Sequence, residues 1–216
     1  MIMVRYADDL VVGFEHEGDA RRFLEAMRER LADFALQLHP DKTRLIEFGR
    51  HAAANRRRRG LGKPETFNFL GFTHICAKTR QGKFLVKRKT RRDRLRAKLK
   101  EVKERLRRRI HQPIPKQGIW LGRIVVGYFN YHAVPTNSAA IVTFRHHVTK
   151  LWLRALRRRG NRDRTTWARI VKLADHYLPR PRVLHPWPEK RFAVKHPRWE
   201  PYAGKPLVRF CAGGAQ

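Results

Sequence analysis

The chain has few cysteines and few acidic residues, and both shortages restrict what it can be. Among its 216 residues are 2 cysteines, Cys76 and Cys211, far apart and without a Cys-X-X-Cys motif. This spacing argues against a disulfide framework and against a zinc knuckle, and free thiols suit a reducing cytoplasm. No apolar run approaches the ~20 residues of a membrane helix, so we expect no membrane partner. Because Arg5, Asp8 and Asp9 interrupt the apolar start, we do not expect these residues to be a signal peptide.

Positive charge dominates what remains. The chain carries 50 Lys and Arg against 18 Asp and Glu, a net charge of +32. Residues 1–48 hold 7 basic and 10 acidic residues, and residues 49–216 hold 43 and 8. Such an excess predicts a polyanionic partner, of which nucleic acid is the first choice and an anionic membrane surface the alternative.

Two adjacent aspartates lie between two short apolar runs in residues 3–14. Each run is typical of a β-strand, and Ala7-Asp8-Asp9 is typical of the tight turn between them. A hairpin that carries paired carboxylates at its tip could hold Mg²⁺, which takes oxygen ligands from one or two carboxylates and from substrate phosphates. The alternative is an ordinary acidic turn.

The next part of the chain predicts a helix and several strands. Apolar residues at spacings of three and four predict a helix over 19–38, with Asp19 as its N-cap. We expect a strand at 45–48, an exposed basic loop at 49–66, an aromatic strand at 67–72 and a partner strand at 83–88. Gly71 would let a nucleic-acid backbone approach closely, or it would mark a bulge.

The C-terminal half predicts four helices, at 90–110, 119–131, 138–158 and from 165 to 177. Thr90 and Asp93 suggest a capping-box variant for the first. Trp120, Trp152 and Trp167 occupy apolar helical positions, so we expect them in the core. The Pro-rich residues 179–216 should be irregular and held by contacts with the helices or with RNA.

Residues 87–109 contain fourteen lysines and arginines and few acids. A solvated helix face usually mixes charges through i,i+4 pairs, which this segment scarcely does, so it favours binding along a phosphate backbone. The nucleic-acid-binding candidates come from this segment and from the basic loop: Arg56, Arg57, Arg58, Arg59, Lys87, Arg88, Lys89, Arg92, Arg96, Lys100 and Lys103.

Several short motifs, in order, resemble those of group II intron reverse transcriptases. Tyr6-Ala7-Asp8-Asp9 resembles the catalytic palm hairpin, and residues 38–43 resemble the palm motif that follows it. Residues 67–72 are similar to the primer-grip hairpin. Residues 127–131, Trp167 and residues 184–188 resemble the maturase, or thumb, domain.

The resemblance implies an α+β fold and specific roles. Residues 1–88 would be the end of a palm, 89–178 a helical thumb and maturase domain, and 179–216 a basic Pro-rich tail. Asp8 and Asp9 would coordinate Mg²⁺, Lys42 would stabilise the leaving pyrophosphate, and Phe69, Leu70 and Gly71 would grip the primer. The implied partners are intron RNA, an RNA/DNA hybrid and target DNA, in a cytoplasmic ribonucleoprotein.

The chain also departs from that family. A palm needs another carboxylate and template-binding segments that lie upstream of the catalytic hairpin, so we expect an N-terminal segment of a longer protein to be missing. By family the activity is RNA-directed DNA synthesis combined with helping the intron to splice. Here we expect RNA binding to survive and catalysis to need the missing segment. The alternatives are a non-catalytic RNA-binding splicing cofactor and a decayed relic.

Overall fold

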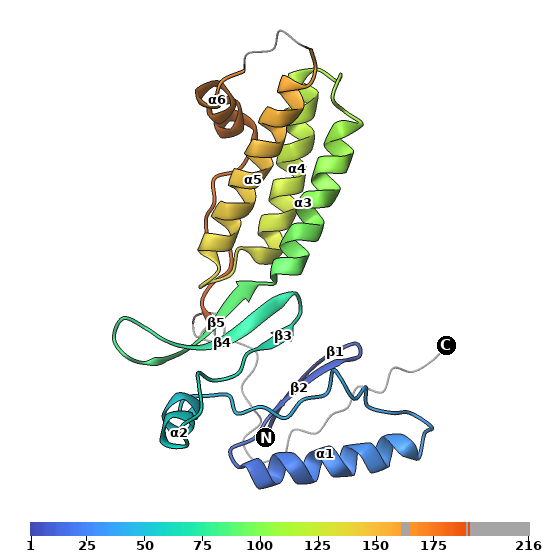
Figure 1. Ribbon diagram of the computed structural model, residues 1–216, viewed down its shortest axis with the longest axis vertical. Helices are drawn as coiled ribbons and strands as arrows, with labels where there is room; N and C mark the ends of the chain where they lie inside the picture. The colour runs from blue at the N-terminus through green and yellow to red at the C-terminus, as the bar shows by residue number, and fades with distance from the viewer. Residues whose placement is uncertain (161–164, 189, 191–216) are drawn as a thin grey trace, which may run out of the picture.

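The computed structural model describes residues 1–160, 165–188 and 190. This part of the chain has an α+β fold, with one two-stranded sheet, one three-stranded sheet and six helices. Helices α3 to α6 stand together at one end (Figure 1). The three-stranded sheet lies beneath them, and the β1–β2 hairpin lies beyond it with α1 and α2.

The first hairpin confirms the predicted strand–turn–strand pattern. Strands β1 (Ile2–Tyr6) and β2 (Asp9–Gly13) are antiparallel, and Tyr6 pairs with Asp9, which leaves Ala7 and Asp8 as a two-residue turn. Ala7 has a φ of +50°, in the left-handed region that tight hairpin turns require. All five residues of β1 are exposed. Nothing in the described ranges covers their apolar side chains.

Helix α1 (Glu17–Ala32) differs from the predicted helix at both ends. Its N-cap is His16 and not Asp19, which lies in the first turn and pairs with Arg22. It ends at Ala32 because Ala35 adopts a φ of +54°, and the Leu36 N–H then bonds the Leu31 carbonyl at 2.9 Å. The helix has no buried residue.

The segment from 33 to 66 was predicted incorrectly in two places. Residues 45–48 form no strand, and the expected basic loop contains helix α2 (Ala52–Arg58). Three successive alanines explain this helix, since alanine is the strongest helix former. Arg56, Arg57 and Arg58 continue the helix that the alanines begin.

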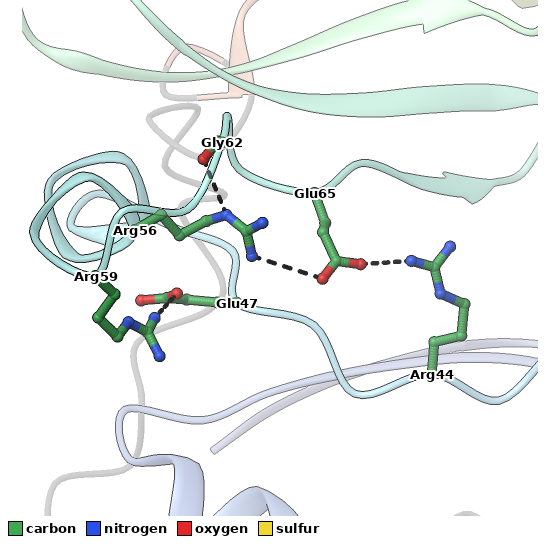
Figure 2. Close-up of polar contacts among 6 residues, drawn as sticks. All are labelled: Arg44, Glu47, Arg56, Arg59, Gly62 and Glu65. Carbon is green, nitrogen blue, oxygen red and sulfur yellow. Dashed lines mark hydrogen bonds and ion pairs between the residues drawn. The ribbon is translucent and has the colours of Figure 1, made fainter.

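Two glutamates bind this irregular segment together (Figure 2). Glu65 lies between Arg44 and Arg56, and Glu47 pairs with Arg59. The Arg56 Nε also donates to the Gly62 carbonyl at 3.2 Å, and its side chain is 17% exposed. Arg56 and Arg59, two of the four basic-loop arginines proposed as nucleic-acid ligands, are therefore engaged in contacts within the protein.

The second sheet has the order β3-β4-β5, formed by Phe67–Phe69, Phe72–Lys78 and Phe84–Thr90. The sequence predicted one strand across 67–72, but Leu70 and Gly71 form a turn between two strands. Their φ values of +47° and +74° fit a type I′ hairpin turn. A strand is confirmed near 83–88, as β5, but it pairs with β4 and not with β3, and the sequence did not predict β4 beyond residue 72.

The predicted helices of the C-terminal half are confirmed as α3 (Arg92–Arg107), α4 (Ile114–His132), α5 (Ser138–Arg157) and α6 (Trp167–Tyr177). Their shared core includes Val102, Leu106, Leu121, Phe144, Trp152 and Ile170. The Thr90 capping box is wrong: Arg91 is the N-cap of α3, and Thr90 ends β5.

The tryptophan prediction holds only in part. Trp152 is fully buried and Trp120 packs against the core, where the Arg109 guanidinium lies 4.7 Å from its ring centroid. Trp167 is 41% exposed, so its assignment to the core is wrong. It is the first residue of α6, whose buried stripe is formed instead by Ile170 and Ala174.

The chain after α6 runs back along the helices without regular structure as far as residue 187. The Leu184 N–H donates to the Ala133 carbonyl at 2.9 Å, and the His185 Nε2 lies 2.7 Å from the Asn130 carbonyl oxygen. These contacts agree with the predicted irregular tail, whose remainder, at 189 and 191–216, lies outside the described residues.

Two features of α4 permit close packing. Glycines at 118 and 122 face α6, where a Cβ on Gly122 would stand 2.6 Å from the Tyr177 carbonyl oxygen. The Gln117 side chain is fully buried. Its Nε2 lies 2.9–3.0 Å from the carbonyls of Arg109, Ile110 and Gln112, and its Oε1 accepts from the Trp152 indole at 2.9 Å.

We predict that Gln117→Glu will destabilise the helical part by about 3 kcal/mol. The substitution would replace the N–H group that now donates to three carbonyls by a buried carboxylate oxygen, which has no hydrogen to donate to them. Gln112→Glu makes the same change at an exposed position and should alter the unfolding free energy by less than about 0.5 kcal/mol. Urea unfolding followed by circular dichroism measures both. Equal stabilities of the two variants would contradict the role given to Gln117.

Candidate nucleic-acid interface

The paired aspartates occupy the tip of the first hairpin. Asp8 is the second residue of the turn and Asp9 begins β2, and both are exposed. The Arg5 Nε donates to the Ala7 carbonyl at 3.0 Å, which stabilises the turn from the preceding strand. Neither aspartate forms an ion pair within the described part of the chain, so both carboxylates are free to bind a cation.

The donor set suits Mg²⁺ but is small. Carboxylate oxygens are the ligands that Mg²⁺ takes from proteins, usually one or two at a time with substrate phosphates completing the shell. Among the described residues, no three Asp, Glu, His or Cys side chains gather around one point. Asp8 and Asp9 could therefore hold an ion that a substrate or a further carboxylate also binds.

The described hydrogen bond of Lys42 lies within its own turn and does not involve the aspartates. Lys42 follows the Pro40–Asp41 turn, where its N–H donates to the His39 carbonyl at 3.3 Å. Its side chain is exposed, and no ion pair joins it to Asp8 or Asp9 in the ranges described. The sequence proposed all three for one catalytic centre. The two aspartates are neighbours at the hairpin tip, and the described contacts include none between Lys42 and either of them.

The grip-like turn is anchored to helix α4, and not only to its own strands. The Tyr131 hydroxyl donates to the Leu70 carbonyl at 2.7 Å, and the Tyr131 ring stacks on Phe72 with centroids 5.7 Å apart. A Cβ on Gly71 would meet the same ring at 3.7 Å, which is ordinary contact. It is therefore the φ of +74°, more than lack of space, that favours glycine here. Phe69 pairs with Phe72 across the turn.

A second connection joins β5 to the loop before α5. The Asn137 side chain is buried and accepts from the Thr90 N–H at 2.9 Å. Its Nδ2 donates to the Thr90 hydroxyl at 2.7 Å and to the His132 carbonyl at 2.8 Å. Thr136 exchanges two hydrogen bonds with the Arg88 backbone, at 2.9 and 3.2 Å. No local sequence pattern indicates the contacts of Thr136 and Asn137 with β5, because they join residues 48 and 47 positions apart.

The basic candidates on β5 divide by burial. Lys87 and Lys89 are exposed, whereas Arg88 is half-buried and burial lowers the pKa of its guanidinium. In the basic loop, Arg57 and Arg58 remain free of ion pairs in the described structure, in contrast with Arg56 and Arg59.

The α3 candidates form one continuous face. Arg92, Arg96, Lys100 and Lys103 recur at spacings of three and four, which places them in one row along the helix, and all four are exposed. Of the three acids of α3, Asp93 pairs with Arg91 and Glu101 with Lys98 and Arg105, while Glu104 forms no ion pair among the described residues. The structure adds Arg107 to this row, and beside it Arg154 of α5 and Arg158, the C-cap of that helix. The sequence interpretation missed these three, although the i,i+4 spacing of Arg154 and Arg158 was visible.

Comparison with known proteins supports the first part of this interpretation. Residues 1–74 match the family model described as reverse transcriptase (RNA-dependent DNA polymerase). The match covers the Asp8–Asp9 hairpin, α1, α2 and β3 and ends within β4. It therefore supports a reverse transcriptase segment in the first third of the chain, a family that generally uses a divalent metal and acts on nucleic acid. No curated protein matches the chain. No helix in the described ranges is long and apolar enough to span a membrane.

The junction between sheet and helices should be sensitive to acid. Burial lowers the pKa of His132 to about 4, and its Nδ1 lies 3.4 Å from the Thr90 hydroxyl. Because the unfolded histidine titrates near 6.5, this group favours folding above that pH, and the benefit is lost as the pH falls from about 6.5 towards 4.

We predict that His132→Gln will weaken the pH dependence of stability. Between pH 7 and pH 5 the unchanged protein should lose about 1–2 kcal/mol more unfolding free energy than the variant. Urea titrations at both pH values measure this difference, and His111→Gln, at an exposed position, should behave as the unchanged protein does. If His132→Gln keeps the full pH dependence, His132 is not the group responsible.

Proposed function

We propose that the chain is part of a group II intron reverse transcriptase and maturase, with an RNA-directed DNA polymerase activity that this chain alone does not complete. The observation that carries the proposal is the match of residues 1–74 to the reverse transcriptase model, a range that includes the Tyr6-Ala7-Asp8-Asp9 hairpin. The ordered motifs in the C-terminal half favour the intron-encoded branch of the family. In this account residues 1–88 end the palm, 89–178 form the thumb and maturase domain, and 179–216 form a basic tail in a cytoplasmic ribonucleoprotein.

Each candidate residue has a role in this proposal. Asp8 and Asp9 would hold Mg²⁺, which would supply positive charge to stabilise the negative charge that develops during phosphoryl transfer. Lys42 stabilises the charge on the leaving pyrophosphate. The Leu70–Gly71 turn contacts the primer backbone, with Phe69 and Tyr131 fixing its position.

The exposed first hairpin supports a requirement for another segment. Ile2 and Met3 are 74% and 48% exposed, and β1 pairs only with β2 among the described strands. An uncovered apolar strand edge is unstable in water and pairs readily with a further strand. We propose that a neighbouring palm strand, from a longer form of the protein or from a second chain, covers this hairpin and brings a further carboxylate to Asp8 and Asp9.

A second candidate function is that of an RNA-binding splicing cofactor without catalysis. The charge of residues 49–216 favours it, since those residues hold 43 of the 50 basic side chains. A decayed relic of a mobile element is the remaining alternative. The two experiments that follow separate these possibilities.

We predict that the full chain binds structured RNA with a steep salt dependence. If about six or more phosphates are neutralised, affinity should fall about a thousandfold or more between roughly 50 and 200 mM salt, because each contact releases counterions. Filter binding over a salt series measures the slope, and Asp8→Asn should leave it unchanged. An affinity that barely changes with salt would contradict phosphate binding and with it both RNA-binding functions.

We predict that the chain alone will not extend a primer with Mg²⁺, and that a separately expressed N-terminal half of a related reverse transcriptase will restore extension. In the restored mixture Asp8→Asn should abolish synthesis, because a metal ligand is lost, while the exposed Asp41→Asn should not. Extension assays with matched RNA-binding measurements test this. Extension by the chain alone, lost on Asp8→Asn, would contradict the requirement for a second segment. RNA binding without restored extension would favour the splicing cofactor.

A further inference from the structure

Helices α3 and α5 begin side by side at the three-stranded sheet and run in the same direction (Figure 1). The hydrogen bonds between Thr90 and Asn137 fix this arrangement, because α3 starts just after Thr90 and α5 just after Asn137. The two helices pack against each other along their length. Residues distant in sequence, near 105 and near 155, therefore face one another at the far end of the pair.

A small groove lies between these far ends. Its cavity of about 80 Å³ has an apolar floor that includes Leu106 and Leu151. Four cations surround it: Lys103 and Arg107 on α3, Arg154 on α5, and Arg158 at the C-cap of α5. All four are exposed.

These cations have no acidic partner in the structure as described. Of the two acids on this part of α3, Glu101 is taken by Lys98 and Arg105, and the exposed Glu104 forms no ion pair with any of the four among the described residues. Each helix also presents its two cations at an i,i+4 spacing, where like charges repel. The folded protein thus holds four positive charges around one groove at a cost in stability that an anion would remove.

We propose that this groove binds consecutive phosphates of an RNA strand, which continues along the α3 row of Arg92, Arg96 and Lys100. The inference rests on the RNA-binding function proposed above and identifies which surface performs it. The cations at i,i+4 recur about every 6 Å along each helix axis, which suits a polymer with regularly repeated charge. Three of the four groove cations are arginines, whose planar guanidinium binds phosphate oxygens in pairs.

The lining of the groove indicates which part of the nucleic acid it contacts. No aromatic side chain lines it, so it offers no surface on which a base could stack. Contacts should therefore go to phosphate and sugar, giving affinity and orientation without sequence preference.

The test compares two double variants that remove the same charge. Arg154→Gln with Arg158→Gln removes two groove cations, while Arg169→Gln with Lys172→Gln removes two exposed cations from α6. The probe is a double-stranded RNA hairpin, and its affinity for the full chain is measured by fluorescence polarisation over a salt series. The groove variant should reduce the slope of log affinity against log salt by about 1.4–1.8, and the α6 variant by less than about half of that. Circular dichroism should show that both variants melt like the unchanged protein or at a higher temperature.

A third variant separates charge from overall damage to the surface. Arg154→Lys with Arg158→Lys keeps both charges and should retain the original slope. If the unchanged chain does not bind the RNA hairpin, the proposed function fails. If it binds and the groove and α6 variants lose equal slope, the groove assignment is wrong while RNA binding stands. Polyglutamate, at equal charge concentration, serves as a competitor. If it displaces the RNA hairpin as effectively as unlabelled RNA does, the groove accepts any polyanion, and RNA as its ligand is overturned.

Discussion

The arrangement of the described structure depends on the buried amide of Asn137. This residue is the N-cap of α5, yet its side chain does not cap that helix and instead bonds Thr90 at the end of β5. The preceding Thr136 has a φ of +74°, a strained conformation for a β-branched residue, and two hydrogen bonds to the Arg88 backbone hold it there. One short loop thus fixes the sheet to the helices and places the starts of α3 and α5 together.

The position of the cations follows from that connection. Once α3 and α5 are parallel neighbours, their apolar stripes meet in the core and the basic row of each helix borders the same groove. Among the described residues, most ion pairs lie away from this groove: the glutamates at 47 and 65 neutralise arginines near α2, and Asp175 of α6 neutralises Arg145. The ion pairs at α3 itself involve Arg91, Lys98 and Arg105, and leave the four groove cations unpaired. The Tyr131 bond to Leu70 connects this helical part to the turn proposed to contact the primer.

Local patterns predicted the elements that local forces determine. The β-branched runs around Ala7 and Asp8 identified the hairpin, and apolar spacing identified α3, α4, α5 and α6 with errors of a few residues. The strand expected at 45–48 failed because a short apolar run forms a strand only where a partner is available. Helix α2 was missed because its arginines were interpreted as a loop, although the alanines before them favour a helix.

Long-range contacts could not be predicted in the same way. Nothing near Thr90 in the sequence indicates Asn137, and a capping box was the reasonable local interpretation of that threonine. The groove is likewise a product of tertiary structure, because Lys103 and Arg154 become neighbours only when α3 and α5 are parallel. The paired aspartates were recognised from sequence since they are adjacent, whereas the position of Lys42 relative to them depends on the irregular segment between.

Lysine acetylation footprinting with and without RNA tests the central claim most directly, that RNA lies along the α3–α5 face. Lysines report this face well, because Lys100 and Lys103 lie on α3, while Lys116 and Lys172 are exposed on α4 and α6. Bound RNA should slow acetylation of Lys100 and Lys103 several-fold and leave the other two unchanged. Equal protection of all four, or protection confined to Lys116 and Lys172, would contradict the account.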